Sequence, residues 1–326
     1  MRKKNVFAGI GSCVGMLVLI LDGRTALEGA AQGLELCLKT VIPSLFPFFV
    51  LSTMLTSALA GEHLPLLRPI GWLCGIPSGG EALLISGFLG GYPVGAQSVA
   101  AAFRSGQLTR NQAERLLSFC NNAGPAFLFG MVSALFPARW MARALWGIHI
   151  AGAVLTACLI PPDEEARMDP MPSAPLSLVS ALRDSLRIMA TVCGWVVLFR
   201  VGIAFLNRWV LTMLPVPARV AVTGLLELSN GCCCLTEVSD LTVRFLLCAG
   251  MLSFGGLCVT MQTVSVTTGL SLRGYFTGKL IQTAFSLLFS AAVMAGYGPA
   301  SCLFLIFAIL LLKLRKKSSI RKVLGV

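Results

Sequence analysis

Apolar runs about 20 residues long recur along this 326-residue chain, and they constrain its fold more than any other feature. A helix needs roughly 17 to 25 mostly apolar residues to cross the hydrocarbon core of a bilayer. Charged residues make up only 12% of the chain, about half the share of an average soluble domain. The sequence therefore predicts an all-α membrane protein that crosses the bilayer several times.

We expect eight crossings, separated by segments of two other kinds. The segment 24–40 mixes charges with leucines at three- and four-residue spacing, which is typical of an amphipathic helix on the membrane surface. The stretches 79–103 and 218–235 are interrupted by glycine and polar residues, so we interpret each as a re-entrant hairpin. The predicted crossings are 5–21, 43–60, 113–136, 142–160, 186–208, 244–268, 276–296 and 299–313.

The distribution of basic residues predicts the orientation of the chain. Nine of the 26 lysines and arginines lie at the two ends, at positions 2–4 and 313–322. Basic residues favour cytoplasmic loops and lipid headgroups, so both termini are expected in the cytoplasm, with lipid and not nucleic acid as the partner of this charge. No cleavage site for a signal peptidase follows the first apolar run, which is expected to remain as a helix.

Cysteine and histidine give no sign of a cofactor site. The twelve cysteines are scattered through apolar segments, and the run at 232–234 lacks the CxxC spacing of a zinc or redox site. Histidine occurs only at His63 and His149. The motifs of zinc proteases, serine hydrolases and P-loop enzymes are missing as well. We therefore expect no cofactor, no metal and no enzymatic activity.

A proline-rich acidic segment at 161–175 divides the chain into halves that share a weak internal repeat. Residues 75–91 match 214–231, and LLSFCNN at 116–122 matches MLSFGGL at 251–257, in the same order and at similar spacing. The predicted units are an N-terminal helix (1–22), a first repeat (23–160), a cytoplasmic linker (161–175), a second repeat (176–298), and a C-terminal helix with a basic tail (299–326).

Each repeat is expected to hold a span, a hairpin and two further spans. Three crossings per repeat invert the second copy relative to the first, so the two hairpins enter from opposite sides and their tips meet near the midplane. Inverted repeats with broken helices around a central site are the architecture of many secondary transporters.

The stretch GFLGGYPVGAQ at 87–97 is the predicted tip of the first hairpin. Gly90, Gly91, Tyr92 and Pro93 form its turn, because glycine lets the backbone bend and proline lacks the N–H of a continuous helix. The half-helix after the turn, which carries Gln97, would offer free N–H groups to an anion. Close helix packing is the alternative role of these glycines.

Polar residues on the following span extend this candidate site. The amides of Asn121 and Asn122 can donate and accept hydrogen bonds to a solute, or can hold neighbouring helices together; both interpretations stay open.

The second half contributes an acidic hairpin and a further charge. Glu227, Ser229 and Asn230 lie in the second hairpin, and an acid at membrane depth needs a partner, a proton or a coupling cation. Arg200, near the centre of its span, either neutralises Glu227 or binds a solute carboxylate directly. Ser253 and Gln262 on the next span complete the predicted site.

The block 87–130, with GGYPVGA and SFCNNAGPAF, resembles the YlbJ-like family of sporulation integral membrane proteins, within the broader nucleoside recognition or Gate-domain family. Weaker similarity runs through IPSLFPFF (42–49) and MLSFGGLCVTMQT (251–263). The resemblance implies a fold similar to concentrative nucleoside transporters, in which an acid of the second hairpin grips the solute; here that acid is Glu227. It also implies export of dipicolinate across the outer forespore membrane.

These features favour a cell-membrane secondary transporter that moves a small polar or anionic solute, dipicolinate-like or nucleoside-like, by alternating access. The alternative is a non-transporting Gate-domain protein that acts in assembly of a sporulation or envelope complex. The coupling ion, a cation or a proton, and a homo-oligomeric state are left open.

Overall fold

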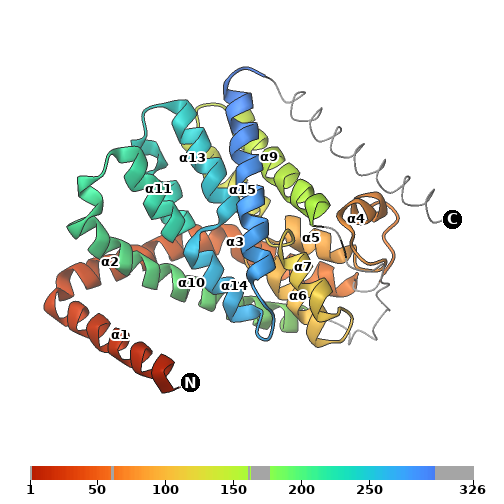
Figure 1. Ribbon diagram of the computed structural model, residues 1–326, viewed down its shortest axis with the longest axis horizontal. Coiled ribbons are helices and arrows are strands. Elements are labelled where there is room, and N and C mark those ends of the chain that lie inside the picture. Colours follow the sequence, from red (N-terminus) through yellow and green to blue (C-terminus); the bar gives the residue numbers. More distant parts are fainter. Residues whose placement is uncertain (1, 60–61, 161, 163–176, 298–326) are drawn as a thin grey trace.

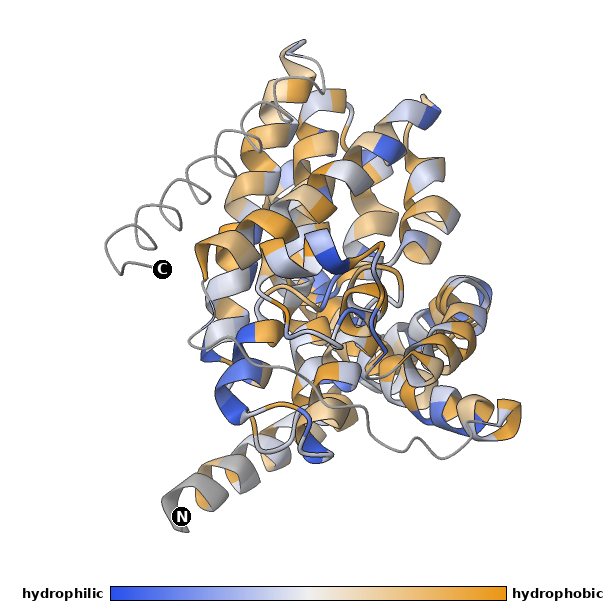
Figure 2. Cartoon of the chain, turned by 90° about the vertical axis from the view of Figure 1, so that its right-hand side faces the viewer, coloured by the Kyte–Doolittle hydropathy of each residue, from blue (hydrophilic) through white to orange (hydrophobic). Residues whose placement is uncertain are grey.

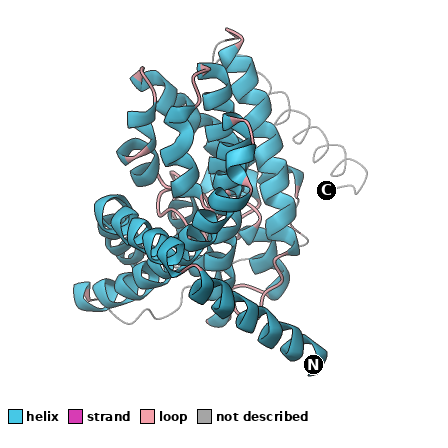
Figure 3. Cartoon of the chain, turned by 90° about the vertical axis from the view of Figure 1, so that its left-hand side faces the viewer, coloured by secondary structure: helices cyan, strands magenta, loops and turns pink. Residues whose placement is uncertain are grey.

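The computed structural model of the protein describes residues 2–59, 62–160, 162 and 177–297 (Figure 1). Within these ranges the secondary-structure elements are all helices (Figure 3). Five helical runs of the described residues are long and apolar enough to cross a membrane. They are 23–55, 139–159, 178–209, 241–266 and 273–294. The predicted all-α membrane protein is confirmed at this level.

The finer predictions on the layout have different outcomes. The number of eight crossings and the likeness to concentrative nucleoside transporters stay predictions. The linker 161–175, apart from Pro162, and the predicted C-terminal helix and tail at 299–326 lie outside the described residues. Most residues of the helices are apolar, and many of the strongly hydrophilic residues lie near helix ends and in loops (Figure 2).

The N-terminal helix α1 (Arg2–Leu21) extends away from the other helices (Figures 1 and 3). Asp22 ends it and caps α2 (Gly23–Leu36), because its side chain accepts a hydrogen bond from the Thr25 N–H at 3.3 Å. The same carboxylate pairs with Arg208 Nε at 3.3 Å. Asp22 therefore joins the start of α2 to Arg208.

The segment expected to be a separate amphipathic helix continues into the next crossing. Helix α2 passes through a π-helical turn (Cys37–Val41) into α3 (Ile42–Ala58). Its buried face packs on α10 (Leu178–Trp209), where a Cβ on Gly29 would lie 2.9 Å from Ala204 Cβ. Gly33, four residues on, makes a similarly close approach, so glycines at this spacing join the helices. The prediction of a helix at 24–40 is confirmed, but the predicted separation of this helix from the crossing that starts at 43 is wrong.

Both predicted hairpins are pairs of short helices. The first consists of α5 (Ala82–Phe88) and α6 (Val94–Arg104), and the second of α11 (Val216–Leu226) and α12 (Leu228–Cys234). In each hairpin, glycines of the two arms touch: a Cβ on Gly95 would lie 2.9 Å from Gly87 Cα, and a Cβ on Gly231 would collide with Gly224. The arms pack closely because these positions carry no side chain.

The predicted crossing 113–136 is not one helix. It consists of α7 (Arg110–Leu117), a non-helical run at 118–124, α8 (Pro125–Gly130) and a 3₁₀ turn (Val132–Leu135). Pro125 accounts for the end of this break, because a residue before proline is pushed out of the helical region; Gly124 is extended, with φ −77° and ψ 158°.

A second break interrupts the predicted crossing 244–268. Helix α13 (Leu241–Phe254) ends at Gly255, and α14 (Gly256–Val266) follows. Gly255 and Gly256 have φ of 82° and 80°, a left-handed conformation that favours glycine.

The remaining helices support these hairpins and breaks. Helix α15 (Arg273–Met294) stands between α13 and α9 (Arg139–Leu159) in Figure 1 and contacts both. Helix α4 (Arg68–Cys74) precedes the first hairpin, and short 3₁₀ turns at Leu211–Met213 and Leu235–Glu237 flank the second. Because α15 lies against both α7 and α13, its side chains reach the two breaks.

Candidate functional site

The tip of the first hairpin and both helix breaks meet in one buried polar cluster. The Tyr92 hydroxyl donates to the Leu252 carbonyl oxygen, just before the second break, at 3.1 Å. From the first break, Asn121 Nδ2 donates to Thr263 Oγ1 of α14 at 2.9 Å. Residues from the two halves of the chain thus bond directly.

A small cavity lies where the two halves face each other. Its volume is about 30 Å³, which is the scale of a single water molecule. The polar part of its wall comes from the tips of both hairpins and from α14. The rest comes from the π-helical turn before α3, from α3, α8 and α10, and from the first helix break. The lining residues are Val41, Leu45, Tyr92, Ala123, Gly124, Phe127, Val192, Val196, Glu227, Leu228, Ser229, Val259 and Gln262. Four predicted site residues, Tyr92, Glu227, Ser229 and Gln262, are among them.

Glu227 is buried, with 2% of its surface exposed, and it caps the helix that follows it. Its Oε1 accepts from the Ser229 N–H at 3.1 Å, and its Oε2 accepts from the backbone N–H and side-chain Nδ2 of Asn230, each at 2.7 Å. Free N–H groups at a helix start favour a negative charge. The N-terminus of α12 therefore binds the carboxylate, and Ser229 and Asn230 supply the hydrogen-bond donors.

Arg200 does not neutralise Glu227. Its Nη2 donates to Gln32 Oε1 of α2, and none of the ion pairs in the described part of the chain includes Glu227. Arg200 also lies outside the lining of the small cavity. The expectation of a charge pair was wrong because Arg200 lies on the face of α10 that packs against α2.

A buried lysine that was not among the predicted site residues lies at the centre of the polar cluster. Lys279, on α15, is 1% exposed. Its Nζ donates to Tyr92 Oη at 3.0 Å, to the Asn121 carbonyl oxygen at 2.5 Å and to Gln282 Oε1 at 2.9 Å. The signal was present in the sequence: a lysine and a glutamine three residues apart inside the predicted crossing 276–296.

Gln282 links this lysine to a second chain of hydrogen bonds. Its Nε2 donates to Asn122 Oδ1 at 2.9 Å and to the His149 carbonyl oxygen at 3.1 Å. His149 Nε2 accepts from the Ala123 N–H at 3.1 Å, so in the neutral ring Nδ1 carries the proton and donates to Ser253 Oγ at 3.3 Å. Ser253 Oγ in turn donates to Ser286 Oγ at 2.6 Å. Ser253 belongs to this hydrogen-bond chain and is not among the residues that line the cavity.

The two asparagines bind protein groups in this conformation. Asn122 Nδ2 donates to the carbonyl oxygens of Gly87 and Phe119 at 3.1 and 2.7 Å. Asn121 Oδ1 accepts from the Ala96 N–H in the first turn of α6 at 3.4 Å. The start of α6, where an anion was expected, therefore receives the Asn121 side chain.

The other predicted residues surround this centre. Gly90, Gly91 and Pro93 form the turn of the first hairpin, and Gly91 approaches Gly124 of the first break. Gln97 lies on α6, and its Oε1 has no hydrogen-bond partner among the described residues. Gln262 Nε2 is 3.3 Å from Cys258 Sγ.

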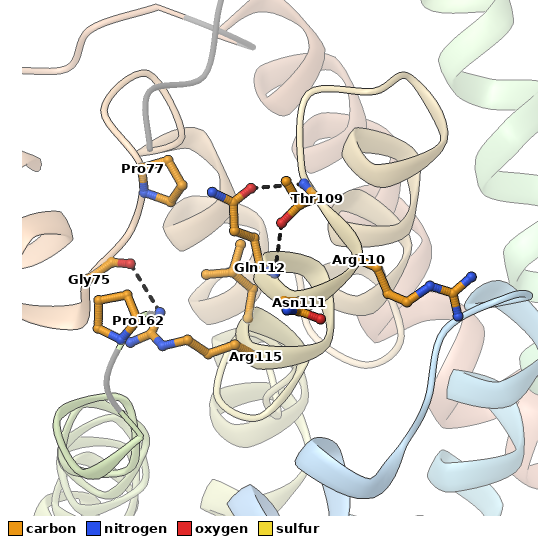
Figure 4. A pocket seen from close by; sticks show the side chains of 9 residues that line it. Gly75, Pro77, Thr109, Arg110, Asn111, Gln112, Arg115 and Pro162 are labelled. Carbon is orange, nitrogen blue, oxygen red and sulfur yellow. Dashed lines mark hydrogen bonds between the residues drawn. The ribbon is translucent and has the colours of Figure 1, made fainter. Parts of the chain in front are cut away.

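A larger pocket of about 330 Å³ lies elsewhere, at the start of α7 (Figure 4). Arg115 crosses its wall, and its guanidinium donates to carbonyl oxygens at the ends of α4 and α9, with 2.6 Å to Cys74 O and 2.8 Å to Ile160 O. Thr109 and Gln112 form a capping box at its rim. The pocket contains none of the predicted site residues, and its arginine stabilises helix ends.

Membrane-length helices, broken helices and a buried polar centre define an integral membrane protein that crosses the bilayer more than once. Comparison with known proteins agrees with this class. Over 321 aligned residues, the chain is 25% identical to the sporulation integral membrane protein YlbJ of Bacillus subtilis (strain 168). The alignment covers 83% of this chain and 78% of YlbJ. The chain is therefore similar to a sporulation integral membrane protein over most of its length. No protein-family model matches it, and no solved structure matches it either.

Proposed function

We propose that this protein is a secondary transporter that moves a small polar or anionic solute across the membrane by alternating access. One observation carries the proposal: the tips of both hairpins, the first helix break and α14 line a common cavity between the two halves of the chain. Broken helices that meet at a central site bind solute and coupling ion in many secondary transporters. A dipicolinate-like or nucleoside-like compound fits this class of solute.

The buried charges support a role in binding. Ionisable residues inside a membrane protein are costly, and they commonly mark solute or ion pathways. Glu227 is in the cavity wall, and Lys279 bonds to the other side of that wall through Tyr92. A solute in the cavity would therefore lie close to both charges.

The structure represents a closed conformation on this proposal. A cavity of about 30 Å³ admits a water molecule but not a solute with ten or more heavy atoms. One hairpin has to move to admit the solute. The second hairpin is the better candidate, since the Glu227 carboxylate bonds only to its own α12, whereas Tyr92 is bonded to α13 and α15.

Transport by the purified full-length chain in lipid vesicles tests the proposal. We expect saturable flux of labelled dipicolinate or a labelled nucleoside, lost about tenfold or more in Glu227→Gln. Glu237→Gln is the matched control, because Glu237 is a half-exposed acid in the 3₁₀ turn directly after the same hairpin, paired with Arg219. Flux no greater than that of empty vesicles for every solute would favour the alternative role, assembly of a sporulation or envelope complex.

Localisation follows as part of the same proposal. The distribution of basic residues supports a cytoplasmic position for both termini. The relative's printed name supports a sporulation role, and a location in the outer forespore membrane of a spore-forming host is part of this proposal.

A further inference from the structure

Three oxygen atoms surround the Lys279 ammonium, and we call them the Lys279 cage: Tyr92 Oη, the Asn121 carbonyl oxygen and Gln282 Oε1. Each of them acts as an acceptor. The Tyr92 hydroxyl hydrogen is used in the bond to Leu252 O, and Gln282 is oriented by two donor bonds of its Nε2. A protonated lysine has three N–H donors, and the cage accepts all three.

Among the described residues, no carboxylate pairs with this charge. None of the ion pairs found in the described residues includes Lys279. The compensation comes from neutral dipoles and from the faces of two aromatic rings, with Nζ 5.0 Å from the Tyr92 ring centroid and 5.9 Å from that of Tyr275. Oxygen dipoles and ring faces are what a protein uses to hold a cation that has no counter-ion.

The cage also lies at a helix break, where ion sites occur in many secondary transporters. The Asn121 carbonyl belongs to the non-helical run 118–124, and Tyr92 belongs to the turn of the first hairpin. Unwound backbone carbonyls at broken helices are the groups that coordinate Na⁺ in many secondary transporters. Here an ammonium that is covalently attached to α15 lies at such a break, and it joins the break, the hairpin and α15.

We propose that the Lys279 ammonium is a built-in cation in a monovalent-cation site, so that this protein needs no bound Na⁺ or K⁺ at its first helix break. The proposal that the Lys279 ammonium occupies the cage rests only on the geometry of its contacts. The consequence that solute movement is independent of a Na⁺ gradient rests on the proposed transport function.

The test compares apparent melting temperatures of the purified full-length chain in NaCl, KCl and choline chloride at equal ionic strength. Wild type is expected to melt at the same temperature in all three salts. In Lys279→Ala the cage is open, so the melting temperature in choline falls by about 5 °C or more and rises again as Na⁺ or K⁺ is titrated in.

Two control variants separate occupancy of the cage from general effects. Lys279→Met keeps the volume of the lysine stem, so we expect a lower melting temperature that neither cation restores. Lys39→Ala removes an exposed lysine, whose partner is Glu35 at 2.7 Å, and is expected to behave like wild type.

Two results would overturn the proposal: a wild-type melting temperature that rises saturably with Na⁺, or a folded Lys279→Ala protein that responds to neither cation. If the variants fail to fold, the wild-type salt comparison decides alone. Solute flux in vesicles separates this inference from the proposed function. Flux that requires a Na⁺ gradient refutes the inference and leaves transport intact, whereas absent flux refutes transport and leaves the melting data to decide on the cage.

Discussion

The Tyr92 hydroxyl donates a hydrogen bond to the carbonyl oxygen of Leu252, 160 residues further along the chain, at 3.1 Å. This bond joins the tip of the first hairpin to the helix before the second break. Tyr92 also accepts from Lys279, so one side chain connects three elements. The relationship makes Tyr92 a structural centre of the site as well as part of the cavity wall.

Tyr92→Phe is expected to destabilise the protein by about 1–3 kcal/mol, because one N–H of the Lys279 ammonium and the Leu252 carbonyl lose their partner in a buried site. Tyr297→Phe is the matched control, since Tyr297 is 66% exposed, and it should change stability by less than about 0.5 kcal/mol. Chemical unfolding in mixed micelles measures both. Equal stability of the two variants would show that the Tyr92 bonds contribute nothing.

Gly231→Ala is expected to disrupt the second hairpin. A Cβ at this position would collide with the backbone of Gly224 and lie 2.8 Å from Met251 Sδ, so the arms of the hairpin have to separate. We expect a loss of about 1–3 kcal/mol. Gly194→Ala on α10 is the control, because no atom lies within 4 Å of the added Cβ, and a helical alanine should be neutral or slightly stabilising. A Gly231→Ala protein as stable as Gly194→Ala would contradict the close packing of the arms.

Local sequence signals predicted much of the fold and part of the site. Glycine and proline weaken a helix wherever they occur, so the turn at Gly90–Pro93 could be located without tertiary information. Tyr92 was identified as part of this turn, and Glu227 because an acid at membrane depth needs a partner. The structure brings both to one cavity.

These local signals could not predict which residues far apart in the sequence contact each other. Hydropathy describes one segment at a time, and it places Arg200 at membrane depth without showing that its helix face meets α2. The bond from Lys279 to Asn121 spans 158 residues and depends on how α15 packs against α7. The continuity of α2 and α3 was missed because the charges of 24–40 suggested a surface helix, whereas Gly29 and Gly33 join it to α10.

Arg200 and Glu227 should behave as independent sites in a double-mutant cycle. We expect the stability effects of Arg200→Gln and Glu227→Gln to add within about 0.5 kcal/mol, because the two side chains share no partner. Arg200→Gln combined with Gln32→Ala should be non-additive, since these residues bond to each other. A coupling energy above about 1 kcal/mol between Arg200 and Glu227 would restore the charge pair that the sequence suggested.

Labelling from each side of the membrane tests whether the hairpins re-enter. Ser105 is exposed at the end of α6, and Ser239 follows the second hairpin. If each hairpin enters and leaves on one side, Ser105→Cys reacts with an impermeant thiol reagent from the cytoplasm and Ser239→Cys from the outside. The unmodified chain is the control, because Cys13 and Cys233 are already exposed. Reaction of Ser105→Cys from the outside alone would mean that the first hairpin spans the bilayer, and the two repeats would then not be inverted.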